Sequence, residues 1–161
     1  MRLRPTLLAA VRMRSADADY LEQVVAAFLG PVLRLRASPE GQWYALLMTR
    51  GLTEPMKETD QILRQYFDPM ANACIDALMD AFAGRTRAQV AWAYQFMLGA
   101  MLHHISDERV QRLSNGSNTP NDPAAAPLLA AFITGGMRRP WRHLLRRFYP
   151  CARASQSRLR E

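Results

Sequence analysis

Reactive residue arrangements are scarce in this chain of 161 residues. Its two cysteines, Cys74 and Cys151, lie far apart and match no metal-ligand or redox spacing, which excludes a disulfide framework. No glycine-rich phosphate loop is present, and no local motif suggests a Ser-His-Asp, Cys-His or paired-carboxylate site. His103 and His104 are adjacent, so on a helix they point about 100° apart and do not form a metal-binding pair. We therefore expect no enzyme, no cofactor and no metal site.

Strand patterns are missing as well. No segment alternates polar and apolar residues over more than a few positions, which argues against a sheet. The chain is 49% apolar and has only 8 glycines, a composition that favours helices. The sequence predicts an all-α bundle of about six to seven helices.

Excess positive charge is confined to one end of the chain. Residues 1–137 hold thirteen basic and thirteen acidic residues, whereas residues 138–161 hold eight arginines and one glutamate. The body of the chain is therefore not a basic nucleic-acid-binding surface. Four apolar residues of the tail fall on one side of a short helix: Trp141, Leu144, Leu145 and Phe148. Three interpretations of the tail stay open, namely a docked amphipathic helix, contact with nucleic acid or an anionic surface, and an unstructured end.

No targeting signal is visible at the amino terminus. The segment "MRLRPTLLAAVRMR" contains an apolar run of only about six residues, which is too short for a secretory signal peptide. With no disulfide framework, this favours a cytoplasmic protein.

Two helices are expected in the first third of the chain. Residues 20–35 place apolar side chains three and four positions apart, and Pro31 should bend or split this helix near Gly30. A second helix should begin with Ser38 as its N-cap and end near Gly51.

A longer apolar stripe runs from Glu58 to Ala83. It predicts a core-facing helix of about seven turns. Pro69 interrupts this helix, and Asp68 and Pro69 are candidates for the cap and first residue of a restarted helix. Thr86 is the expected N-cap of the helix that follows.

That next helix has no charged face. Residues 88–106 carry no formal charge over nineteen positions. A polar loop follows, and then a second uncharged helix at 123–137, capped by Asp122 and ended by Gly135 and Gly136. A helix that is apolar around its circumference must be covered on more than one side.

Lipid, a large core or another subunit are the three ways to cover such helices. The chain is too small for a second core layer, and a membrane span would bring Gln89, Gln95 and both adjacent histidines into hydrocarbon. Two such helices per chain, paired with their symmetry mates, form a four-helix bundle with a two-fold interface, so we expect a homodimer. The interface candidates are Trp92, Leu98, Leu102, His103, Leu128, Ala131, Phe132 and Gly135.

Several segments of the chain resemble a known family. They include "YLEQVVAAFLGPVLRL", "LRQYFDPMANACIDALMDAF", "QVAWAYQFMLGAMLHHISD" and "DPAAAPLLAAFITGGM". Roughly from Leu7 to Met137, they are similar to the C-terminal regulatory domain of the tetracycline-repressor (TetR) family of bacterial transcription regulators. The chain then divides into a remnant connecting helix at 1–18, the regulatory domain at 19–137 and the Arg-rich tail at 138–161.

The resemblance implies a domain that binds a small, mostly apolar effector in its interior. The candidate lining residues are Trp43, Tyr44, Leu47, Met48, Tyr66, Phe67, Met70, Trp92, Phe96 and Met101. Relatives carry an N-terminal helix-turn-helix of about fifty residues that reads operator DNA, and residues 1–18 leave no room for it. We therefore expect dimerisation and effector binding without operator binding by this chain itself. The alternative is an interaction protein, which forms mixed dimers with a full-length regulator or binds nucleic acid or an anionic membrane through the tail.

Overall fold

The described part of the chain is built of helices alone. A computed structural model describes residues 19–53, 57–82 and 84–139, and no strand occurs within these ranges, which confirms the all-α prediction. The elements are α2 (Tyr20–Ala37), α3 (Gln42–Thr53), α4 (Lys57–Ile62), the π-helical turn η1 (Leu63–Phe67), α5 (Asp68–Ala81), α6 (Arg87–Ser106), α7 (Val110–Leu113), the 3₁₀ turn η2 (Pro123–Ala125) and α8 (Ala126–Arg138).

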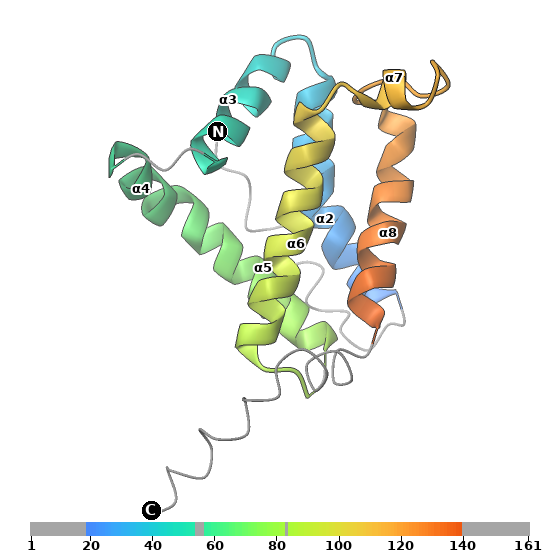
Figure 1. Ribbon diagram of the computed structural model, residues 1–161. Helices are drawn as coiled ribbons and strands as arrows, with labels where there is room; N and C mark the ends of the chain where they lie inside the picture. Colours follow the sequence, from blue (N-terminus) through green and yellow to red (C-terminus); the bar gives the residue numbers. More distant parts are fainter. Residues whose placement is uncertain (1–18, 54–56, 83, 140–161) are drawn as a thin grey trace, which may run out of the picture.

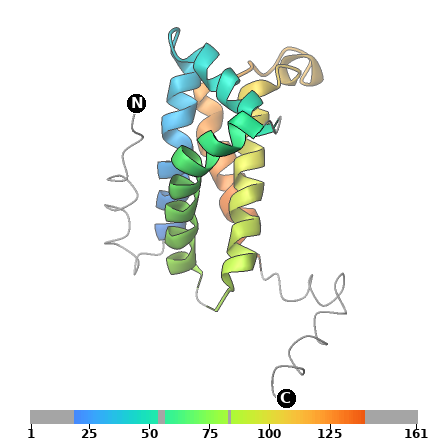
Figure 2. The same ribbon diagram turned by 90° about the vertical axis from the view of Figure 1, so that its left-hand side faces the viewer.

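Helix α2 lies at the centre of the bundle. It packs against α3, α5 and α8, while α6 packs against α3, α5 and α8 in turn. Figures 1 and 2 show α2, α6 and α8 running alongside one another, with α3 and α4 at one end of the bundle. One side of α6 and one side of α8 therefore face away from all the other described helices.

The core lies between α2, α5, α6 and α8. Its fully or almost fully buried members include Tyr20, Val24, Val25, Leu29, Cys74, Leu78, Val90, Ala93 and Met97. Burying one such Val, Leu or Met side chain is worth roughly 1.5–3 kcal/mol. Burial also raises the pKa of the Cys74 thiol to about 12, so this cysteine stays protonated and acts as a small apolar residue.

The two internal prolines affect their helices differently. Helix α2 continues through Pro31 as one element from Tyr20 to Ala37. Of the two expected outcomes, a bend or a split near Gly30, the split does not occur. At Pro69 the helix does change, because the turn before it is π-helical and Asp68 N–H donates to the carbonyl oxygen of Leu63. Asp68 is the first residue of α5 rather than its cap, and Pro69 lies at the helix start, where a missing N–H costs little.

The predicted caps at the starts of helices agree with the structure better than the predicted helix ends do. Thr86 forms a reciprocal capping box with Gln89, and the Asp122 carboxylate accepts the backbone N–H of Ala124 at 2.8 Å. Ser38 Oγ accepts the N–H of Gly41 at 3.0 Å, although α3 itself begins at Gln42.

The predicted end of α8 at Gly135 and Gly136 is wrong, because the helix continues to Arg138. Neither glycine has a positive φ, so neither adopts the left-handed conformation that ends a helix. The next residue, Met137, is buried, and its carbonyl oxygen accepts a hydrogen bond from Arg85 Nη2 at 2.6 Å. Core packing and this bond stabilise the last turn.

Candidate functional site

Helix α6 buries one face and exposes the opposite one. The buried face consists of Val90, Ala93, Met97, Met101 and Ile105, at spacings of three and four. The exposed face carries Trp92 and Phe96, which keep 61% and 62% of their surface open. Their rings stack at a centroid distance of 5.7 Å and an interplanar angle of 25°. Gly99 and His103 continue this face toward the end of the helix, and a Cβ added at Gly99 would meet no atom within 4 Å.

Helix α8 also has one buried face and one exposed face. Ile133, Thr134 and Met137 are buried, whereas Leu128 and Phe132 are 73% and 74% exposed. Ala131 and Gly135 lie on this exposed face, one turn apart. Since α6 and α8 pack against each other, two exposed apolar faces belong to neighbouring helices (Figure 1).

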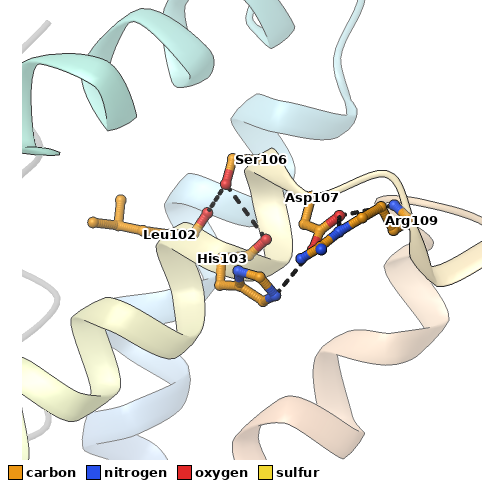
Figure 3. A network of polar contacts seen from close by, with 5 residues as sticks. All are labelled: Leu102, His103, Ser106, Asp107 and Arg109. Carbon is orange, nitrogen blue, oxygen red and sulfur yellow. Dashed lines mark hydrogen bonds and ion pairs between the residues drawn. The ribbon is translucent and has the colours of Figure 1, made fainter.

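A polar network marks the carboxyl end of α6 (Figure 3). His103 Nε2 lies 3.1 Å from Asp107 Oδ2, and the same carboxylate accepts hydrogen bonds from the guanidinium of Arg109 at 2.6 and 2.9 Å. Hydrogen bonds from Arg109 hold the pKa of Asp107 well below its usual range. Ser106 Oγ donates to the carbonyl oxygen of Leu102 at 2.7 Å. The apolar face of α6 therefore ends at a fixed, charged corner.

The predicted interface residues differ in their exposure to solvent. Six of them are exposed, namely Trp92, His103, Leu128, Ala131, Phe132 and Gly135. Leu98 and Leu102 are half-buried and pack against the core cluster of the same chain. In Figure 3 the side chain of Leu102 points away from the polar network.

The predicted lining residues also fall into separate groups. Met101 is buried in the core, and Phe67 and Met70 are half-buried. The strongly exposed members are Trp43, Leu47, Tyr66, Trp92 and Phe96. The side chains of Tyr44 and Met48 lie outside the described part of the structure, as do residues 140–161 of the Arg-rich tail. Among these residues, the structure brings Trp92 and Phe96 into direct ring contact.

Phe96 is one of the predicted lining residues that the structure places on the surface. It was predicted to line an interior site, yet it lies with Trp92 on the outer face of α6. The spacing of four residues between them is the signal that places both on one helix face. The sequence alone did not show which face of this uncharged helix is outward, because its apolar residues surround the whole circumference.

Two negative findings concern the described residues. No group of three or more His, Cys, Asp or Glu side chains is placed there to hold a metal ion. No helix in the same ranges combines the length and apolarity that a bilayer crossing requires.

Comparison with known proteins identifies the family. Residues 26–136 match the family model described as "Tetracyclin repressor-like, C-terminal domain". No curated protein and no solved structure matches the chain significantly. The matched range covers more than half of the 161 residues and includes α6 and α8 with their exposed faces. The chain therefore belongs to the tetracyclin repressor-like C-terminal domain family, a family of regulatory domains and not of enzymes.

Proposed function

We propose that this chain is the dimerisation and effector-binding domain of a TetR-like transcriptional regulator, and that it forms a homodimer through α6 and α8. The observation that carries the proposal is the pair of exposed apolar faces on these helices. Four large side chains, Trp92, Phe96, Leu128 and Phe132, are each more than 60% exposed on them.

Leaving several large apolar side chains exposed to water is unfavourable in free energy. Burying one fully contributes roughly 1.5–3 kcal/mol, and aromatic residues are enriched at subunit interfaces. The small residues Gly99, Ala131 and Gly135 lie on the same faces and allow a partner helix to come close. A two-fold axis would bring α6 and α8 of one protomer against the same helices of its partner, which covers both faces at once.

Phe96 joins the predicted interface, because it stacks on Trp92. Leu98 and Leu102 take a place at its edge, since the core of their own chain already covers them in part. His103 stands beside the Asp107–Arg109 pair at the end of the face. This polar corner supplies a rim around an apolar centre, which is the usual anatomy of a subunit interface.

Effector binding is the second part of the proposal. A small apolar effector would contact the residues of α3, η1, α5 and α6 that face the interior, among them Phe67, Met70 and Met101. Aromatic and methionine side chains suit such a ligand because they adapt to its shape. In a complete cytoplasmic regulator the effector would favour one spacing of the two protomers and operator DNA the other. Operator contact requires a helix-turn-helix, which the described residues do not include.

The dimer is tested by measuring molar mass in solution. Sedimentation equilibrium at micromolar concentration should give a dimer for the wild type and a monomer for Phe132→Glu, which places a charge in the centre of the face. The matched control is Leu113→Glu, because Leu113 is 71% exposed on α7 and lies outside both faces. A folded wild-type monomer, or dissociation by the control as well, would overturn the proposal.

Effector binding is tested with the uncharged fluorescent probe N-phenyl-1-naphthylamine. The dimer should bind one probe per chain with a saturable rise in fluorescence. Met70→Trp, which adds volume at a half-buried lining position, should weaken this binding, whereas Leu113→Glu should leave it unchanged. A probe signal that never saturates, or that Met70→Trp does not alter, would contradict an interior apolar site.

A further inference from the structure

The structure contains a cavity that shares no residue with the predicted effector lining. Its volume is about 490 Å³, and it lies where the end of α2, the end of α6 and the start of α8 come together. That size is sufficient for a small organic molecule. The inference drawn from it goes beyond the proposed function and does not depend on it.

The walls of this cavity are mainly apolar. Ile105 is buried at its base, and the half-buried Leu33 and Ala126 come from α2 and α8. Ala37 and Pro123 are exposed and stand at the opening. Three helices therefore contribute to one concave apolar surface.

Two polar side chains in the wall lack partners among the described residues. Arg34 is exposed on α2, and no hydrogen bond or ion pair connects it to another described residue. Its Nη1 lies over Gly30, where a Cβ would come within 3.0 Å of it. The half-buried imidazole of His104 also lines the cavity and has no described hydrogen-bond partner. Both groups can therefore donate a hydrogen bond to a ligand.

The other polar groups of the cavity are already occupied. Arg36 Nε donates to the carbonyl oxygen of Ile105 at 2.9 Å, and its Nη2 lies 3.7 Å from the Glu108 carboxylate. With its oxygen toward Arg36, the Asn121 amide accepts from Nη2 at 3.0 Å. The Asp122 carboxylate accepts the N–H of Ala124 at 2.8 Å. Arg34 is thus the arginine of this cavity that has no ion pair with a described residue, while the Asp122 carboxylate is the acidic side chain in the same lining.

We propose that this cavity binds an organic carboxylate with an apolar body, whose carboxylate pairs with Arg34. The guanidinium offers a planar pair of donors that matches a single carboxylate in a bidentate arrangement. A doubly charged phosphate fits less well, since the Asp122 carboxylate also lines the cavity and repels a second negative charge. His104 supplies an additional donor, and Leu33, Ile105 and Ala126 contact the apolar body.

Calorimetric titration with octanoate tests this proposal in the full-length chain. We expect saturable binding of one octanoate per chain, and about tenfold or more weaker binding of the uncharged octan-1-ol. Arg34→Gln should weaken octanoate binding by a similar factor and leave octan-1-ol unchanged. Arg139→Gln is the matched control, because it removes an exposed arginine beyond the opposite end of α8, and it should bind octanoate like the wild type.

A blocking variant locates the site. Ala37→Phe places a large side chain at the opening from an exposed helical position, and it should abolish binding of both octanoate and octan-1-ol. Equal binding of octanoate by Arg34→Gln and the wild type, or full binding by Ala37→Phe, would overturn the proposal. Circular dichroism and molar mass should be those of the wild type in each variant. Because N-phenyl-1-naphthylamine binding and dimer mass are measured separately, failure here is distinguishable from failure of the proposed function.

Discussion

Arg36 is a charged side chain in a place where charge is costly. It is only 8% exposed, and its guanidinium connects α2 to the end of α6 through the carbonyl oxygen of Ile105. Glu108 lies 3.7 Å from Nη2 and balances part of the charge. A buried arginine is tolerated when its donors are paired in this way.

Replacing Arg36 tests this interpretation. Arg36→Met keeps most of the apolar stem but removes the donors, so that a carbonyl oxygen loses its partner. The free energy of unfolding should fall by about 1–3 kcal/mol, measured by urea denaturation. Arg34→Met, two positions earlier and exposed, should change it by no more than about 0.5 kcal/mol. An equal loss in the free energy of unfolding for the two variants would show that the buried contacts of Arg36 do not stabilise the fold.

His104 should make stability depend on pH. Burial lowers the pKa of this imidazole below its ordinary value of 6.5. As the pH falls below that value, the unfolded chain takes up a proton that the folded chain resists, so the folded state loses stability. This contribution is complete above the unfolded pKa and is lost on acidification.

The measurement is the thermal midpoint of wild type and His104→Gln between about pH 7.5 and pH 5.5. The midpoint of the variant should fall less on acidification than that of the wild type, since glutamine does not titrate. Parallel curves for the two proteins would show that His104 has no part in the pH dependence.

At the scale of elements, the start of α6 is defined by local chemistry. The Thr86 side chain accepts the N–H of Gln89 at 3.3 Å, and the Gln89 side chain accepts the N–H of Thr86 at 3.0 Å. These bonds satisfy two of the N–H groups that the first turn leaves without helical partners. Both belong to one short segment, so the sequence predicts this cap.

Thr86→Ala removes the hydroxyl acceptor of this capping box. The free energy of unfolding should fall by about 0.5–2 kcal/mol, measured by urea denaturation. Thr86→Ser keeps the acceptor and should stay close to the wild type. If serine is as destabilising as alanine, the effect comes from packing of the methyl group and not from the cap.

At the scale of the whole molecule, folding and association should be linked. If α6 and α8 are covered by a partner, then the free energy of unfolding includes the dimer interface. The thermal midpoint of the wild type should then rise by a few degrees when the chain concentration is raised about a hundredfold. Phe132→Glu should melt at a lower temperature that does not change with concentration. A constant midpoint for the wild type would contradict a dimer that is stabilised by these faces.

Much of the fold follows from the sequence because helix signals are local. The helical class, the cap at Thr86, the change of helix at Pro69 and two almost uncharged helices are all visible as patterns within a few residues. The predicted positions of the helix ends are less accurate, because α8 continues through Gly135 and Gly136. There the buried Met137, which no local pattern can place against the core, stabilises the last residues of the helix.

The sequence by itself determined that two helices are almost free of charge, since the apolar character of a segment is a property of its own residues. Only the tertiary structure decided which side of α6 faces the core, because apolar residues surround that helix and do not distinguish inside from outside. The cavity beside Arg34 and the burial of Arg36 are likewise tertiary. They depend on residues from three helices that are distant in the chain and come together only when the bundle packs.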